Sequence, residues 1–136
     1  MSALLDTSFL FALVDASDRQ HARVLEAAQS LQEPLILPVP VLPEVCYLIG
    51  SRLGHETMRR FLAELASSDV RLESLDKADL RRTIEILTQY ADSKLDFVDA
   101  TLVAIAERCN VTRILTLDRR DFMMVRPRHC SYFVTI

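Results

Sequence analysis

Four acidic residues lie where the sequence pattern predicts that a strand ends or a helix begins. They are Asp6, Glu44, Asp99 and Asp118. The first and the last directly follow short apolar runs that are typical of buried strands. The other two stand in the first turns of predicted helices. In a parallel sheet, the carboxyl ends of strands and the amino ends of the helices that follow them meet at one edge, so we expect the four carboxylates to converge there.

Converging carboxylates repel one another and raise one another's pKa values unless a cation compensates them. Hard divalent cations prefer oxygen ligands, so this pattern favours Mg²⁺ or Mn²⁺. A cation held in this way can polarise phosphoryl oxygens and activate water for in-line attack on a phosphodiester. The sequence offers no Cys–His pair and no serine elbow as a competing nucleophile. The acids therefore predict a metal-dependent hydrolase that acts on phosphodiesters.

Each acid also has a purely structural interpretation. An Asp after a strand is a common helix N-cap, which is the more frequent role for Asp6 taken alone. A Glu in a first helical turn complements the helix dipole, as Glu44 would. Asp96 and Asp99 are three residues apart on one helix face, which also fits a capping pair. We assign Asp96 to the N-cap and Asp99 to the metal, because the helix beyond Asp99 is too apolar to leave a carboxylate bare, and leave open whether Asp96 also ligates the metal.

The elements that would position these acids alternate between strands and helices. Strands are expected at residues 3–5, 35–37, 70–72, 111–117 and 132–134. Helices are expected at residues 7–13, 18–31, 44–53, 56–67, 77–90 and 96–107, followed by a short turn or helix at 119–123. This alternation implies right-handed crossovers and a mostly parallel sheet of about five strands with helices on both faces.

Composition narrows the class of protein. A chain of 136 residues, half of them hydrophobic, is expected to form one domain with its own core. A net charge of −3 argues against a generic nucleic-acid coat protein, which would be basic. Three cysteines without CxxC spacing argue against structural zinc or a disulfide framework and fit a reducing cytoplasm. We expect no signal peptide, no membrane span and, with two glycines, no phosphate-binding glycine loop.

The sequence resembles the PIN-domain ribonucleases, in particular the small single-domain toxins of the VapC type. The matching segments are Leu4-Leu5-Asp6-Thr7-Ser8, Pro43-Glu44-Val45, Phe97-Val98-Asp99-Ala100 and Leu115-Thr116-Leu117-Asp118-Arg119. They span nearly the whole chain in the family's order, which makes them specific together. The resemblance implies one domain over residues 1–136, a three-layer α/β/α PIN-like fold, and a metal-dependent site that cleaves RNA.

The same resemblance implies roles for individual residues. The family's acidic positions are matched by Asp6, Glu44, Asp99 and Asp118. Ser8 and Thr116 match its small hydroxyl positions near the metal, although many relatives carry Asn where this chain has Ser8. Asp96 stands where a Ser or Thr cap is frequent. The resemblance also implies a homodimer and, for a toxin, a small antitoxin protein as partner.

Arginines crowd the C-terminal part of the chain. They are Arg113, Arg119, Arg120, Arg126 and Arg128. Only Asp118 and Asp121 oppose them there. We expect Arg119 or Arg120 to flank the acidic site and to contact RNA phosphates. A solvated surface is the alternative interpretation.

The predicted helices 44–53 and 56–67 carry more apolar residues than one buried face needs. These residues include Tyr47, Ile49 and Phe61. Together with the family resemblance, this excess predicts that two copies of the chain associate through some of them.

Other classes of protein share parts of this pattern. Receiver-like binding modules usually carry an acidic pair after the first strand and a late lysine, but here Thr7 follows Asp6 and no lysine follows Lys94. A haloacid-dehalogenase phosphatase needs a second Asp where Ser8 stands. A catalytically silent PIN domain that only holds partners is a further alternative, and intact acids at all four positions argue against it. Metal titration separates this alternative from an enzyme.

Overall fold

β1 (Ala3–Leu5) is the central strand of a five-stranded parallel sheet. The computed structural model describes residues 1–136 and orders the strands β3-β2-β1-β4-β5. The other strands are β2 (Leu35–Pro38), β3 (Arg71–Glu73), β4 (Arg113–Leu115) and β5 (Val134–Thr135). In register, Leu4 of β1 lies between Ile36 of β2 and Ile114 of β4. Because β1 is paired on both sides, the residue that follows it is fixed at the middle of the sheet edge.

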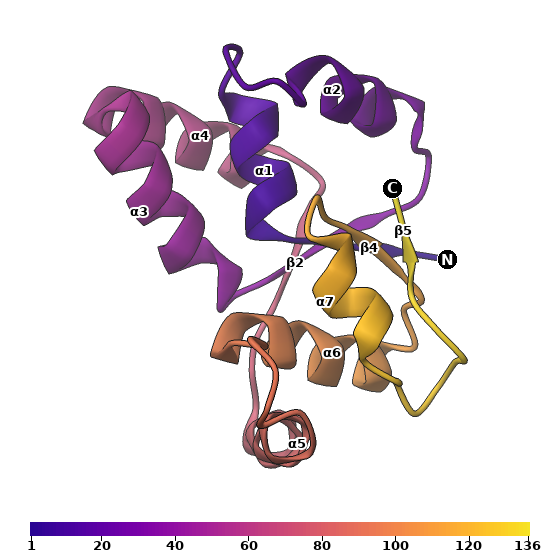
Figure 1. Cartoon of the computed structure of the whole chain (residues 1–136). Coiled ribbons are helices and arrows are strands. Elements are labelled where there is room, and N and C mark those ends of the chain that lie inside the picture. Colours follow the sequence, from indigo (N-terminus) through magenta and orange to yellow (C-terminus); the bar gives the residue numbers. More distant parts are fainter.

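Helices cover both faces of this sheet (Figure 1). One layer consists of α1 (Thr7–Val14), α2 (His21–Ser30), α3 (Val41–Leu53) and α4 (His55–Ser67). The other contains α5 (Lys77–Gln89) and α6 (Phe97–Cys109), which pack against each other. The short α7 (Arg119–Met124) follows β4. The predicted three-layer α/β/α architecture and its parallel sheet are confirmed.

α6 is buried on almost every side, as its continuous apolar sequence predicts. Every residue from Asp99 to Ala106 is buried, since the helix lies between the sheet and α5. The carboxylate at its start therefore enters a largely apolar environment. No helix in the chain combines the length and the apolar character needed to cross a membrane.

The first turn of α3 differs from the prediction. The helix was expected to begin at Glu44, but it begins at Val41. Pro43 is accommodated inside the first turn, where a backbone N–H would have no helical partner in any case. The predicted end is correct, because Gly54 follows the helix with a φ of +103° that favours glycine.

Smaller differences concern other element boundaries. β4 is shorter than the predicted 111–117. Beyond Leu115, the backbone N–H groups of Leu117 and Asp118 donate to side-chain hydroxyl groups at the sheet edge and not to a neighbouring strand. The last strand lies at Val134–Thr135 instead of 132–134. α2 begins at His21, three residues after the predicted Asp18, since Asp18 instead closes a turn by accepting the backbone N–H of Gln20.

Two residues predicted at a self-association surface belong to the core. Ile49 is 0 % and Phe61 8 % exposed. α3 packs against both α1 and α4, so apolar residues on two of its faces are buried within the protein. Only Tyr47 of the three named residues is available to a partner, with 74 % of its surface exposed.

Candidate metal centre

Asp6 occupies the middle of the sheet's carboxyl edge, where β1 passes into α1. Its backbone N–H donates to the Leu115 carbonyl at 3.1 Å and so continues the pairing of β1 with β4. Its Oδ1 accepts the backbone N–H of Thr7 at 2.8 Å, and its Oδ2 accepts the Thr116 hydroxyl at 2.7 Å. The residue is only 4 % exposed. Burial raises the pKa of Asp6, hydrogen bonds from Thr116 and Thr7 oppose this shift, and the charges of Glu44 and Asp96 add to it.

Two hydroxyl groups tie the ends of β1 and β4 together beside this carboxylate. Ser8 Oγ lies 3.2 Å from Thr116 Oγ1 and accepts the backbone N–H of Leu117 at 2.9 Å. Thr116 Oγ1 also accepts the backbone N–H of Asp118 at 2.9 Å. The chain segment that leads to Asp118 is thereby held against the start of α1.

Asp96 and Asp99 share the first turn of α6 but have different surroundings. Asp96 is exposed and is the N-cap, because its Oδ1 accepts the backbone N–H of Asp99 at 2.9 Å. Asp99 is 8 % exposed, and no hydrogen bond or ion pair of the chain involves its carboxylate. Burial, followed by the charge of Asp96 and those of other acids, raises the pKa of Asp99 to about 8.

Asp118 and Asp121 bring two further carboxylates to the same place from the start of α7. Asp99, Asp118 and Asp121 each offer a carboxylate oxygen, and these oxygens lie within 4.8 Å of one another. Burial and the neighbouring Asp121 raise the pKa of Asp118 to about 6. Sequence reasoning assigned no role in the site to Asp121. The available signal was its spacing, because Asp118 and Asp121 repeat the three-residue interval of Asp96 and Asp99.

Glu44 belongs to the first turn of α3 and acts on Asp6 through its charge. Its charge raises the pKa of Asp6, which places it within electrostatic reach of that carboxylate. It is half-buried in the first turn of α3 and is not one of the three residues whose oxygens cluster within 4.8 Å. Of the four acids expected at one edge, the structure therefore clusters Asp99 with Asp118, sets Asp6 beside them, and leaves Glu44 at the margin.

The arginines of the C-terminal part are used in different ways. Arg113 pairs with Glu33 at 3.3 Å, and Arg128 pairs with Glu85 at 2.7 Å. Arg119 Nε donates to Thr135 Oγ1 at 3.2 Å, which holds its side chain toward β5. Arg120, between Asp118 and Asp121 in the sequence, is exposed and forms no ion pair within the chain.

The donor set of this edge fits a hard divalent cation. All its candidate ligands are oxygen atoms, the preference of Mg²⁺ and Mn²⁺. No Lys or Arg side chain forms an ion pair with Asp6, Asp99 or Asp118. A buried carboxylate without a hydrogen-bond donor or a cation is unfavourable, and Asp99 is one. A bound cation would remove that imbalance.

Comparison with known proteins agrees with this geometry. The PIN domain family matches residues 3–125, which is most of the chain. The chain belongs to the PIN domain family. The expected family is thus confirmed, and neither the receiver-like nor the dehalogenase alternative applies to this PIN domain.

Several relatives of this PIN domain are VapC proteins. The chain is 36 % identical over 133 residues to Ribonuclease VapC26 of Mycobacterium tuberculosis, covering 98 % of each protein. Its structure matches that of VapC20 from the same organism, a sarcin-ricin loop cleaving toxin, with a TM-score of 0.81 and 26 % identity over 87 % of this chain and 91 % of that one. It also shares its fold with VapBC2 of Rickettsia felis, bound to a promoter DNA fragment, at a TM-score of 0.74 and 14 % identity over 100 % and 99 % of the two chains.

Proposed function

We propose that this PIN domain is an Mg²⁺- or Mn²⁺-dependent endoribonuclease and the toxin of a toxin–antitoxin pair. The observation that carries the proposal is the buried Asp99 carboxylate, which lacks any partner and faces Asp118 at an edge that also holds Asp6. The relative at 36 % identity is named a ribonuclease, and a relative of known structure cleaves the sarcin-ricin loop. Both names support RNA as the substrate class.

The chain's own residues would divide the work of hydrolysis. The residues proposed to hold the cation are Asp6, Glu44, Asp99 and Asp118. The bound cation would supply charge stabilisation at the scissile phosphate and would activate the attacking water. Thr116 and Ser8 orient the Asp6 carboxylate and hold the segment leading to Asp118. Asp96 orients the first turn of α6 through its cap, so that Asp99 faces the other acids.

Cleavage of a structured RNA tests the proposal directly. Purified protein with Mg²⁺ or Mn²⁺ should cut the RNA internally, and EDTA should stop the reaction. The variant Asp99→Asn should be inactive although folded, whereas Asp92→Asn, in the exposed turn between α5 and α6, should retain activity. Cleavage that continues unchanged in EDTA would contradict a metal-dependent reaction. A protein that binds neither Mn²⁺ nor Mg²⁺ would instead be the catalytically silent PIN domain.

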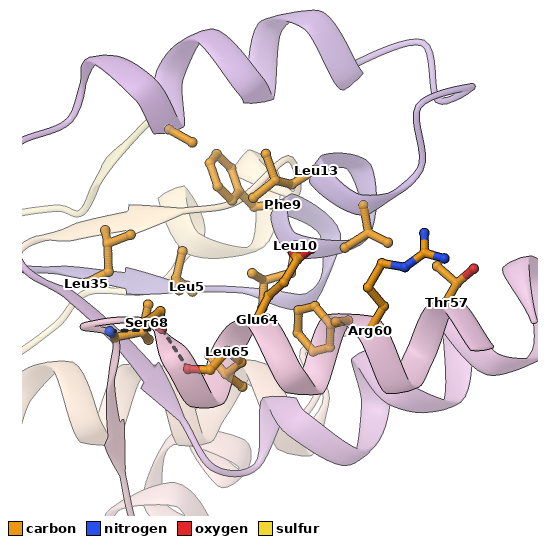
Figure 2. Close-up of a pocket in the computed structure, with 14 residues that line it drawn as sticks. Leu5, Phe9, Leu10, Leu13, Leu35, Thr57, Arg60, Glu64, Leu65 and Ser68 are labelled. Carbon is orange, nitrogen blue, oxygen red and sulfur yellow. Dashed lines mark hydrogen bonds between the residues drawn. The ribbon is translucent and has the colours of Figure 1, made fainter. Parts of the chain in front are cut away.

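We propose that the antitoxin docks on the face formed by α1, α2 and α4. A cavity of about 390 Å³ lies there, lined mostly by apolar side chains. Figure 2 shows Leu10, Leu13 and Leu65 around it, with Arg60 and Glu64 among the few charged residues. An apolar segment of the antitoxin is the occupant that we propose, because solved structures that share this fold include toxin–antitoxin complexes.

Co-purification with a small protein encoded beside the gene tests this docking surface. Leu65→Glu should abolish the complex, whereas Leu80→Glu, on the exposed side of α5, should not. A thermal melt shows whether the variants are folded, and Ala28→Arg, on the α2 side of the cavity, provides a second disruption. A complex that survives both changes in folded protein would exclude the cavity as the docking surface.

We also propose a homodimer that buries Tyr47 of α3. The side chain is 74 % exposed, and an exposed aromatic ring is a common interface anchor. Sedimentation should detect a dimer at micromolar concentration, and Tyr47→Asp should shift it to monomer. Tyr132→Asp changes another exposed tyrosine and serves as the control. A monomeric wild-type protein would contradict the proposal. We further place the protein in the cytoplasm, where its three unpaired cysteines would stay reduced.

A further inference from the structure

Three helices of this chain begin with the same pair of residues, an Asp at the N-cap and an Asp three positions later. The pairs are Asp76 and Asp79 at α5, Asp96 and Asp99 at α6, and Asp118 and Asp121 at α7. Identical local spacing makes them a matched comparison. What differs among them is the compensation of their negative charge.

At α5 the chain itself supplies a cationic partner to the buried Asp. Asp76 Oδ1 accepts the backbone N–H of Asp79, and Asp79 Oδ2 accepts that of Asp76, at 2.7 and 3.1 Å. Asp79 is 3 % exposed, and its two oxygens accept hydrogen bonds from Arg108 Nε at 2.9 and 3.1 Å. The fold thus supplies a cation to a buried Asp in this position, as burial of charge requires.

At α6 and α7 that compensation is missing. Asp99 is nearly as buried as Asp79, yet it has neither a hydrogen bond nor an ion pair. Asp118 precedes α7 but makes no side-chain capping bond. The oxygens of Asp99, Asp118 and Asp121 lie within 4.8 Å of one another, and no Lys or Arg pairs with any of them. Charges so close are strongly repulsive in a partly buried site.

The position of Asp121 is fixed by its neighbour. Phe122 is fully buried and packs edge-on against Phe133, with ring centroids 6.3 Å apart. This anchor holds α7 against the core, and the carboxylate of Asp121 lies close to those of Asp99 and Asp118. Asp6, by contrast, already accepts hydrogen bonds at both of its oxygens.

We propose that Asp121 is a further metal-ligating residue of this site, which contacts the divalent cation from beside Asp99 and Asp118. Asp6 remains one of the proposed ligands and keeps its hydrogen bonds to Thr7 and Thr116. This inference rests on the proposed function, because it names a further ligand for the same cation. It assigns to α7 a part in metal binding that the sequence pattern did not reveal.

Calorimetric measurement of Mn²⁺ binding to the purified full chain tests whether Asp121 ligates the metal, independently of catalysis. Asp121→Asn should weaken binding at least tenfold, and Asp121→Glu should recover part of it. Asp92→Asn removes an exposed acid of the turn between α5 and α6 and should bind as the wild type does. Without metal, Asp121→Asn should melt at the same temperature as the wild type or higher, because repulsion is relieved.

The outcomes separate the two proposals. Unchanged Mn²⁺ affinity in folded Asp121→Asn, with a wild type that binds Mn²⁺ and cleaves RNA, overturns the role of Asp121 and leaves the proposed function intact. A wild type that binds no divalent cation overturns both. If Asp121→Asn does not fold, Asp121→Ser keeps a small polar residue in the first turn of α7 and takes its place in the same titration.

Discussion

Thr116 Oγ1 donates a hydrogen bond to Asp6 Oδ2 at 2.7 Å, joining residues 110 positions apart in the chain. The same oxygen accepts the backbone N–H of Asp118. One hydroxyl group therefore orients one acid of the candidate site and fixes the backbone of another. The geometry of the site depends on a residue that need not touch the metal.

Replacing Thr116 with Val removes this hydroxyl and keeps the side chain's shape. Thr116 is fully buried, so the partners left without a hydrogen bond should destabilise the protein by about 1–3 kcal/mol. Mn²⁺ affinity should also fall, because Asp6 and Asp118 lose their relative position. Thr116→Ser restores the hydroxyl and should recover both properties. Urea unfolding and Mn²⁺ titration measure them, and a Val variant with wild-type affinity would show that the bond is not needed for metal binding.

Stability of the metal-free protein should depend on pH through Asp99 and Asp118. Their pKa values, about 8 and about 6, exceed the unfolded value of ~3.9. The folded state therefore binds these protons more tightly, and stability falls as pH rises from ~4 to about 6 for Asp118 and to about 8 for Asp99. The difference in melting temperature between wild type and Asp99→Asn isolates the contribution of Asp99 to this pH dependence. That difference should change as the pH rises from ~4 to about 8. Mn²⁺ affinity should rise with pH up to about 8, because binding releases the proton of Asp99. A difference in melting temperature that does not change with pH would contradict the raised pKa of Asp99.

Asp96 and Asp99 should respond differently to substitution. Asp96→Ala removes the observed cap and should cost about 0.5–2 kcal/mol of stability, with a smaller loss of activity. Asp96→Ser should restore most of that stability. Asp99→Asn should abolish cleavage and weaken Mn²⁺ binding, while the metal-free protein stays equally or more stable. Thermal melts and single-turnover cleavage compare them, and an inactive but folded Asp96→Ser would make Asp96 a ligand.

Arg120 is the stronger candidate of the two arginines for contact with RNA. It forms no ion pair in the chain, whereas Arg119 is hydrogen-bonded to Thr135. If Arg120 contacts a phosphate of single-stranded RNA, Arg120→Ala should reduce the salt slope of binding by ~0.7. Arg81→Ala removes an exposed and unpaired arginine of α5 as a control. Equal salt slopes in the two variants would mean that Arg120 is ordinary surface.

The sequence predicted the parts of the site that follow from local pattern. Asp6 stands after a short apolar run that is typical of a buried strand, and Asp96 has the spacing of a cap, so both positions could be predicted from neighbours in the chain. Asp121 was missed although its spacing from Asp118 was an available signal, because an Asp that follows two arginines resembles a balanced surface charge. Its proposed role depends on its closeness to Asp99 of α6, which only the folded chain brings about.

The same limit explains the errors in helix surfaces and charges. Ile49 and Phe61 were predicted at an interface because a helix with two apolar faces suggests a partner, but here the partners are α1 and other helices of the same layer. Arg113 and Arg128 belong to a cluster in the sequence, yet each pairs with a glutamate distant in the chain. Periodicity gives the faces of a helix and not the identity of what covers them.

The pairing of β1 with β4 also sets the time at which this site can exist during protein synthesis. A ribosome makes the first acid early, but the strand that completes its surroundings comes after most of the other elements. At about 5–20 residues per second, the 110 positions between Asp6 and Thr116 take roughly 5 to 22 s to translate. Throughout this interval a nascent chain carries Asp6 without Asp118 or Asp121. On the proposed function, a chain within this interval therefore lacks the complete set of acids that RNA cleavage requires.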